Sequence, residues 1–325
     1  MIGGTAGYLA SRLVTTVLIV FGAMLLLFSL SVIVPGDPAT ALIGPQATPA
    51  YKAQVIAEMG LDQPVHVRLY RFFSAVLSGD LGTDALTGRR VATVVGAVLP
   101  YTFILTFLAI GLAVLIGVPL GCFAATNRGS VFDHVLAFIS VAFIAIPSFV
   151  IAIFLLLIFT IWLDWLPVLG TGTAGDIVDQ AKRTILPTVA LALGWIGFIA
   201  RLVRSSMLEV MGEPHIRTMR AYGIAPWLLT YKYALKNAAI PTIAILGMGV
   251  GRLLGGAVLV EIVFARPGLG RLIYDAIATR NYPVLQGAVL VVVVVFVITN
   301  LIVDLSYSAI DPRIRSQAGR EAMPR

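Results

Sequence analysis

Long stretches without a charged side chain constrain this sequence more than any other feature. The run from Leu99 to Ala124, for example, contains no Asp, Glu, Lys or Arg. Because about 20 apolar residues in a helix cross the hydrocarbon core of a bilayer, such runs predict transmembrane helices. Charged residues make up only 12% of the chain, whereas about a quarter is usual in a soluble domain. The sequence is therefore that of an integral membrane protein.

Division of the chain at its charges predicts an all-α, polytopic membrane protein with six transmembrane helices. The predicted spans are Leu13–Val34, Leu99–Ala124, Val135–Leu163, Ile185–Val203, Ile240–Val263 and Gln286–Tyr307. The first of them resembles a signal peptide, but its apolar run is longer than that of a signal peptide and no small-residue cleavage site follows. We therefore expect that residues 1–34 hold the N-terminus and a retained first span.

The basic residues indicate which side of the membrane each loop occupies. Both the segment 204–239, between the fourth and fifth spans, and the tail 313–325 are rich in Lys and Arg. Such loops are usually cytoplasmic, so both termini are expected in the cytoplasm. We expect the protein in the inner or plasma membrane of the cell. The remaining parts are then an external loop over 35–98 and a transmembrane core over 99–312. Three arginines of the fifth loop would lie outside, against this rule: Arg266, Arg271 and Arg280.

The external loop contains the signals of two short helices. The stretch TPAYKAQVIAEMG begins with Thr48 as a helix cap and Pro49 in the first turn, and it stops at Gly60. These are the usual start and stop residues of a helix. The stretch QPVHVRLYRFFSAVLSG predicts a second helix that ends at Gly79. Two such helices bury little core, so we expect a cap on the bundle.

Motifs for catalysis are missing from the sequence. No phosphate-binding loop of the G-x-x-x-x-G-K-S/T type occurs, and the glycine-rich match at Gly170–Gly175 lacks the required strand–helix context. The histidines His66, His134 and His215 do not have metal-ligand spacing, and Cys122 is the only cysteine. The net charge of +7 is explained by basic cytoplasmic loops. We expect no enzymatic activity, no bound metal and no nucleic-acid partner.

The basic segment after the fourth span predicts a short helix. Pro214 suits a first helical turn, and Gly223 suits a left-handed helix end. About nine residues make a rod about 13 Å long. Ile216, Met219 and Tyr222 recur at every third position, so we expect them to share an apolar stripe.

Charged side chains border that stripe, and a second helix follows it. Arg217 and Arg220 flank the stripe on one side and His215 lies on the other, while a second helix is predicted over Pro226–Asn237. From the residues alone, two interpretations remain open. The first helix either lies on the membrane surface or docks into a groove of another protein.

An arginine interrupts the fifth predicted span. Arg252 lies near its middle, where a charge costs several kcal/mol. It accompanies a stripe formed by Gly247, Gly251 and Gly255, a pattern of small residues that permits close helix packing. Arg252 either meets an anionic group of a ligand or forms an ion pair with an acidic residue of another chain. Glu261, nine positions later on the same helix, is a poor partner because it faces nearly the opposite way.

Several long blocks of the chain resemble the B-type permease subunit of the dipeptide/oligopeptide ABC importer family. The blocks are PGDPATALIG, MGLDQPVHVRLYRFF, SGDLGTDALTGRRV, RTMRAYGIAPWLLTYKYALKNAAIP, LLGGAVLVEIVFARPGLGRLIYDAIATRNYPVLQG and NLIVDLSYSAIDPRIR. The resemblance implies the type I importer permease fold, pairing with a homologous C-type permease, two cytoplasmic ATPase subunits and an external peptide-binding protein. Cofactors would be absent from this chain, because ATP and Mg would bind to the ATPase subunits.

The resemblance also implies a role for the basic segment. It would be the coupling helix, with Ile216, Met219 and Tyr222 as an apolar plug in an ATPase cleft and Arg217 and Arg220 at the rim. The chain departs from the family's E-A-A-x-x-x-G pattern, because Arg217-Thr218-Met219 stand at the first three positions and only Gly223 is kept.

The predicted function is that of a permease subunit for oligopeptides or dipeptides in an ATP-driven importer. Nickel and glutathione importers of the same family share these motifs. The alternative from another class is a secondary transporter driven by an ion gradient. No acidic residue is predicted at mid-membrane depth to act as its ion relay.

Overall fold

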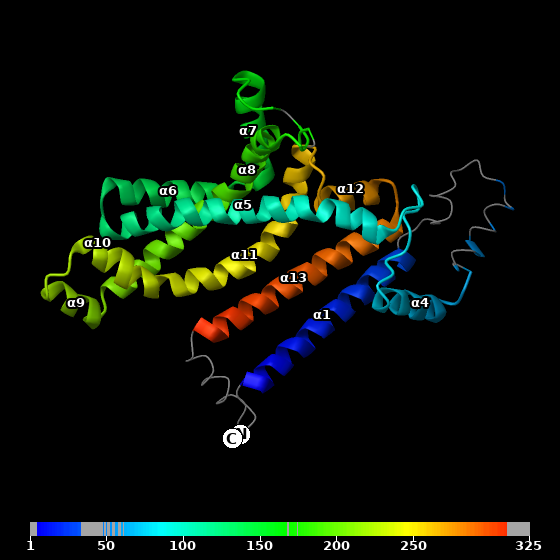
Figure 1. Ribbon diagram of the computed structural model, residues 1–325, viewed down its shortest axis with the longest axis horizontal. Helices are drawn as coiled ribbons and strands as arrows, with labels where there is room; N and C mark the ends of the chain where they lie inside the picture. The colour runs from blue at the N-terminus through cyan, green and yellow to red at the C-terminus, as the bar shows by residue number, and fades with distance from the viewer. Residues whose placement is uncertain are drawn as a thin grey trace. The chain divides into compact units, whose positions relative to one another are not determined.

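The structure, a computed structural model, describes residues 5–33, 48, 50, 53, 56, 57, 60, 62–167, 169–173 and 175–310. The chain divides into two compact units, one made of residues 1–100 with 268–325 and the other of residues 101–267. All regular structure within the described residues is helical (Figure 1), apart from one isolated antiparallel bridge between Thr83 and Arg90.

The first unit joins the two ends of the chain. It contains α1 (Thr5–Ile33), α4 (Val65–Leu77), the first turns of α5 (Val91–Thr126), α12 (Leu269–Ala278) and α13 (Tyr282–Ile310). Helix α13 packs against both α1 and α12, and α4 packs against α1. The aromatic rings of Phe21 and Phe73 lie 5.1 Å apart at that last contact. The predicted helix in the external loop is thus confirmed as α4, and Gly79 (φ +81°) follows its end. The predicted helix over Thr48–Gly60 lies largely outside the described residues.

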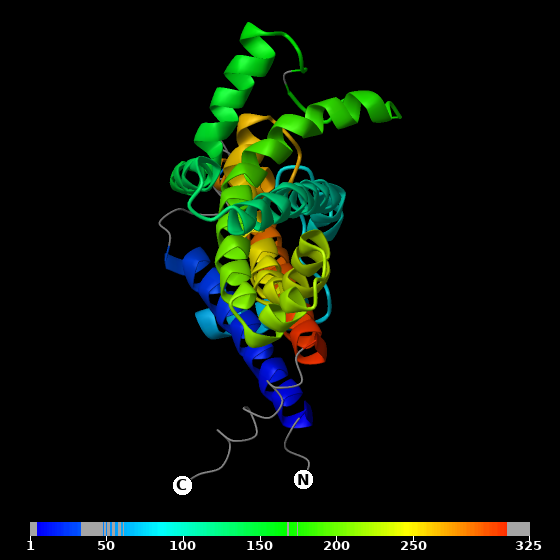
Figure 2. The ribbon, with the colours of Figure 1, turned by 90° about the vertical axis from the view of Figure 1, so that its left-hand side faces the viewer.

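The second unit is built around one long helix, α8 (Ile177–Met211). The other helices of this unit are the rest of α5, α6 (Val131–Ala145), α7 (Ser148–Leu156), η1 (Leu157–Trp162), α9 (Pro214–Ala221), α10 (Pro226–Leu228), η2 (Leu229–Ala234) and α11 (Leu235–Val263). Helix α8 contacts α6, α7 and α11. Figure 2 shows η1 and the start of α8 as separate arms joined by a loop.

Glycines allow the helices of this unit to pack closely on α8. A Cβ atom on Gly121 of α5 would lie 2.6 Å from the carbonyl oxygen of Ala200, and one on Gly197 of α8 would lie 2.8 Å from that of Ser140 in α6. Any larger residue would therefore separate the helices. Small residues serve this purpose in membrane bundles, where the lipid supplies no hydrophobic force between helices.

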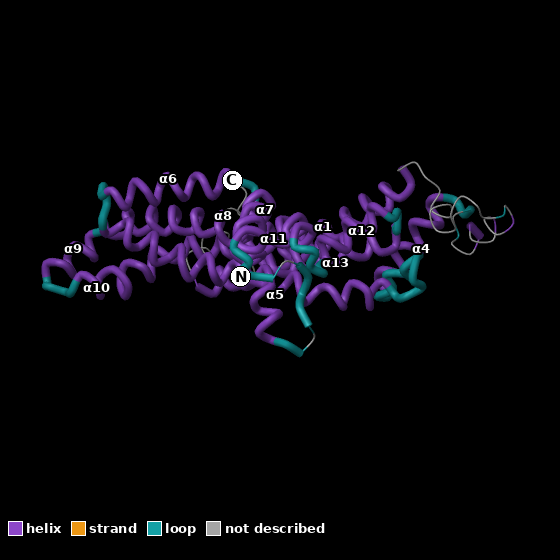
Figure 3. Tube along the Cα trace, turned by 90° about the horizontal axis from the view of Figure 1, so that it is seen from above, coloured by secondary structure: helices purple, strands orange, loops and turns teal. Residues whose placement is uncertain are grey.

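The expected long apolar helices are present, but one of them is broken. Among the described residues, five helices are long and apolar enough to cross a membrane, and α6 with α7–η1 forms a sixth candidate that is bent by 98°. The sequence predicted a continuous span over Val135–Leu163. The break occurs at Pro147, whose ring and missing N–H disrupt the helix, and Ile146 before it is extended (φ −82°, ψ 123°). Figure 3 shows the helices and the loops between them.

Candidate functional site

The segment after α8 folds as a short helix with the expected ends. Glu213 is extended and precedes Pro214, which begins α9. At the other end, Gly223 adopts φ +78° and donates its backbone N–H to the carbonyl oxygen of Arg220 at 3.0 Å. The proline start and glycine stop predicted from the sequence are confirmed. Helix α9 packs on α8 and η2, and it lies with α10 at one end of the second unit (Figure 1).

The apolar residues of α9 do not share one face. Ile216 is fully buried in the core that contains Met207 of α8 and Leu229 of η2. Met219 is half-buried against the same core, whereas Tyr222 is 83% exposed. A step of three residues falls short of a helical turn by about 60°, so the stripe rotates by about 120° from Ile216 to Tyr222. Ile216 therefore anchors α9 to the core of this chain. This corrects the prediction that Ile216, Met219 and Tyr222 together form an apolar surface for an ATPase cleft.

The polar residues of α9 are turned mostly to solvent. Arg217 and Arg220 are exposed, as are Pro214 and Gly223 at the helix ends. His215 is half-buried, and its Nδ1 atom lies 3.0 Å from Oε2 of Glu213. The free surface of α9 therefore combines a tyrosine ring with two guanidinium groups.

The second helix of the segment is not separate from the next span. The sequence predicted a helix over Pro226–Asn237, but helix continues from Pro226 through the π-helical turns of η2 into α11. The hydroxyl of Thr230 donates to the carbonyl oxygen of Pro226 at 2.9 Å. Trp227 and Tyr231 are 65% and 52% exposed. No helix end lies between Pro226 and the fifth span, so α10, η2 and α11 form one continuous helix.

An ion pair that the sequence did not reveal joins α8 to α6. Nη2 of Arg204 donates to Oδ2 of Asp133 at 2.7 Å, and Nε donates to Oδ1. The carboxylate also accepts the N–H of Gly129 at 3.0 Å, while Ser130 caps the helix start. The Asp133 side chain is only 5% exposed. The sequence does show an Asp three residues after a Ser that can cap a helix. It does not show that Arg204, 71 residues later, is the partner of this Asp.

Arg252 lies in α11 at a cavity of about 330 Å³. The cavity is lined by residues of the α6–α7 break, including Pro147, and by Trp195 of α8. Arg252 is exposed, and no described carboxylate lies within ion-pair distance of it. Glu261, in agreement with the prediction, is used elsewhere, since it accepts the hydroxyl of Thr102 at 2.7 Å.

The small residues around Arg252 are not all packed against a neighbouring helix. Gly251 is half-buried, and Gly255 is exposed with open space where a Cβ would be. The close approach is made instead by Gly249, where a Cβ would lie 2.5 Å from the Trp195 ring. Gly249 lies two residues from Gly251, or about 200° around the helix, so this contact is made by a different face from the predicted glycine stripe. Gly255 of that stripe is left open within this chain.

Comparisons with known proteins agree on the class of the chain. Residues 117–316 match the family model described as binding-protein-dependent transport system inner membrane component, and residues 6–105 match the model of its N-terminal region. A dipeptide transport system permease protein of Alkalihalophilus pseudofirmus is 37% identical over 329 residues, which cover 95% of this chain and 99% of the relative.

Two further comparisons add a second relative and a solved structure. A glutathione transport system permease protein of Salmonella paratyphi A is 38% identical over 303 residues, covering 93% of this chain and 96% of the relative. The inward-facing MetNI methionine ABC transporter matches with a TM-score of 0.56 at 20% identity, over 67% of this chain and 96% of the matched chain. That likeness confirms the importer permease fold.

Proposed function

Because the chain belongs to the family of inner membrane components of binding-protein-dependent transport systems, we propose that it conducts oligopeptides or dipeptides through an ATP-driven importer. It is a multi-pass inner-membrane permease subunit of an ABC importer, and this subunit family lacks ATPase activity. Relatives named for dipeptides and for glutathione, itself a small peptide, support the peptide class. Glutathione in particular, or nickel, is the alternative substrate within the family.

Helix α9 is the proposed contact for an ATPase subunit. This role is supported by the two sides of the helix. Ile216 is fully buried against α8 and η2, whereas Tyr222 is 83% exposed and can contact another subunit. A short helix held in this way cannot move without moving α8. Closure of the ATPase subunits around ATP would then turn the permease as a rigid body. Directional transport requires that α9 make different contacts in the two states.

The membership of the chain in this family supports the remaining subunits of the proposed importer. The external peptide-binding protein delivers the peptide, and a homologous C-type permease completes the path across the membrane. The two ATPase subunits hold ATP and Mg on the cytoplasmic side, where both termini of this chain lie. The exposed Arg217 and Arg220 fit that side, since basic residues concentrate in cytoplasmic loops.

Arg252 is the proposed contact for the terminal carboxylate of the peptide. It is the one charged residue among those that line the cavity beside Pro147, and the described residues provide it with no carboxylate. Arg252→Gln is expected to raise the KM for peptides with a free carboxylate about tenfold or more, since a charge-assisted hydrogen bond is lost. Peptides amidated at the C-terminus should be unaffected. An equal loss for both peptides, with poor subunit assembly, would favour an ion pair with the partner permease.

Uptake by proteoliposomes tests the function as a whole. The complete importer is expected to accumulate labelled di- and oligopeptides only when ATP and the binding protein are supplied. Vesicles that hold this chain alone, with a proton or sodium gradient, serve as the control. Gradient-driven uptake by the chain alone would contradict the proposal and favour a secondary transporter.

A further inference from the structure

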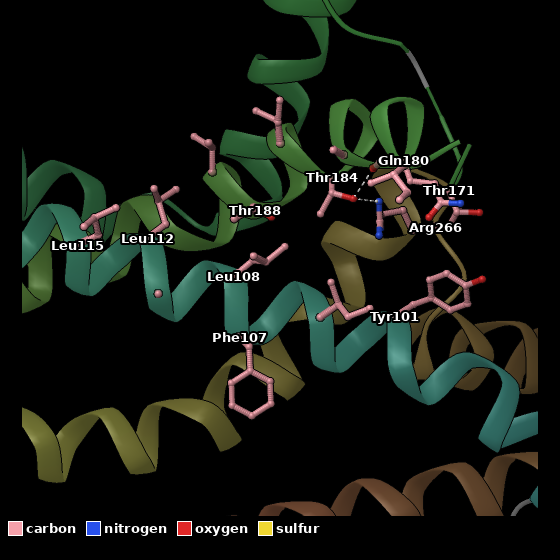
Figure 4. Close-up of a pocket in the computed structure, with 16 residues that line it drawn as sticks. Tyr101, Phe107, Leu108, Leu112, Leu115, Thr171, Gln180, Thr184, Thr188 and Arg266 are labelled. Atoms are coloured by element: carbon pink, nitrogen blue, oxygen red, sulfur yellow. Dashed lines mark hydrogen bonds between the residues drawn. The ribbon is translucent and has the colours of Figure 1, made fainter. Parts of the chain in front are cut away.

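A second cavity lies in the second unit, apart from Arg252 and α9. It has a volume of about 690 Å³ and lies between α5 and the first half of α8 (Figure 4). Phe107, Leu108 and Leu115 of α5 form part of its wall and are 58%, 48% and 71% exposed. Large apolar side chains so exposed along one groove require an apolar cover.

One end of the groove is polar and positively charged. Arg266, in the loop after α11, is only 3% exposed, and its Nη1 donates to the carbonyl oxygen of Arg183 at 3.2 Å and to the hydroxyl of Thr184 at 3.1 Å. Its Nε atom is buried without a hydrogen-bond partner among the described residues, and so is the hydroxyl of Thr188. Figure 4 shows Arg266, Thr184 and Gln180 together at this end, with Leu112 and Leu115 leading away from them.

The residues that line the groove do not neutralise the positive charge of Arg266. None of the residues that line the groove is an Asp or a Glu. Burial lowers the pKa of Arg266, although its electrostatic interactions with Glu261 and Tyr101 oppose this effect. A buried cation of this kind is stabilised by an anion that also accepts hydrogen bonds.

The dimensions of the groove fit an amphiphile in one leaflet. The candidate span of α11 ends at Val263, three residues before Arg266, so the positive end lies near the expected membrane surface. From Tyr101 to Leu115 the α5 wall runs for about 21 Å at 1.5 Å per residue. The hydrocarbon part of one leaflet is about 15 Å thick. A headgroup at Arg266 and a chain along Leu108 and Leu112 therefore match the groove end to end.

We propose that this groove is a phospholipid-binding site, with the headgroup phosphate at Arg266 and an acyl chain along α5 and α8. The buried guanidinium and the unpartnered Thr188 hydroxyl supply donors for phosphate oxygens. The exposed leucines and Phe107 are covered by the acyl chain instead of by water. This role is separate from peptide conduction, since the groove shares no lining residue with the Arg252 cavity.

Two variants test the site without relying on one another. Arg266→Gln removes the charge. Gly111→Trp is expected to fill the groove, because Gly111 lines it and a Cβ at this position meets nothing within 4 Å. Gly96→Trp is the matched control, since Gly96 is also on α5 with open space around its Cβ but does not line the groove.

The measurement is phospholipid retention by the full-length protein, purified with its importer subunits and exposed to phosphatidylglycerol that carries a photoactivatable acyl chain. The parent protein and Gly96→Trp are expected to be labelled on α5 and α8. Labelling should fall about tenfold or more in Arg266→Gln, because a charge-assisted hydrogen bond is lost, and also in Gly111→Trp. Glycerol phosphate, which has no acyl chain, should not compete.

Three outcomes would overturn the proposal. Equal labelling of all four proteins would show that the groove holds no lipid. Efficient competition by glycerol phosphate would show an anion site without an acyl component. Crosslinking of Leu108→Cys to the partner permease, with lipid excluded, would show that the groove is a subunit interface.

Discussion

The two ends of α8 are built in opposite ways. Toward its C-terminal end, Arg204 is paired with the buried Asp133, and Ile216 of the adjoining α9 is fully enclosed. Toward its N-terminal end, Thr188 has a buried hydroxyl without a partner, and the neighbouring groove of about 690 Å³ is lined by exposed apolar side chains. The first arrangement is rigid, because its groups are paired or enclosed, and we expect it to transmit a displacement. The second can exchange an occupant without disturbing the packing.

The largest expected effect comes from the anchor of α9. Ile216→Ala should lower the free energy of unfolding by about 2–5 kcal/mol, because it removes a fully buried side chain and leaves a cavity. Leu108→Ala in the open groove, at 48% exposure, should cost less than about 1 kcal/mol in the same detergent. Thermal unfolding of the two variants provides the measurement. Equal losses would remove the distinction between the two ends.

The ion pair between α8 and α6 gives a smaller effect. Asp133→Asn should cost about 1–3 kcal/mol, because a hydrogen-bonded charge at a 5% exposed site is lost. Asp179→Asn, in the more exposed pair with Arg183 at the other end of α8, should change stability little. We also expect Asp133→Asn to lower peptide uptake per ATP hydrolysed by the reconstituted importer. An unchanged ratio would show that this pair stabilises the fold but does not transmit movement.

Substitutions at two glycines of the same helix are expected to have effects of opposite sign, and one of these effects is the smallest predicted. Gly121→Ala should destabilise the protein by about 1–3 kcal/mol, because its Cβ would lie 2.6 Å from the Ala200 carbonyl oxygen. Gly111→Ala, with nothing within 4 Å, should stabilise it by about 0.5–1 kcal/mol through helix propensity. Chemical denaturation in mild detergent can resolve the opposite signs. The same sign at both positions would mean that the groove is packed rather than open.

The parts of the fold predicted from the sequence are those fixed by local chemistry. The spans follow from the length of apolar helix that a bilayer requires, and α9 follows from Pro214 and Gly223 at its ends. The break at Pro147 was not predictable in the same way, because Pro187 and Pro241 remain inside continuous helices. Neighbouring helices decide which proline is accommodated.

The candidate sites show the same limit. Arg252 stood out because a charge interrupts an apolar span, whereas Arg266 looked like an ordinary loop residue until the fold buried it. Likewise, the every-third-residue pattern of α9 identified its apolar residues but could not tell which one faces the core. Which residue faces the core depends on the contacts between α9 and η2. The spacing of apolar residues does not predict how the chain between these two helices turns.

The most direct test of the account is a crosslink between α9 and an ATPase subunit. The only native cysteine, Cys122, is buried, so a thiol placed at position 222 or 216 can be addressed selectively. In the assembled importer, Tyr222→Cys should crosslink to the ATPase with a short bifunctional thiol reagent, to a degree that changes when ATP binds, and Ile216→Cys should not. Crosslinking of Tyr222→Cys to the external binding protein, or none to the ATPase in any nucleotide state, would contradict the account.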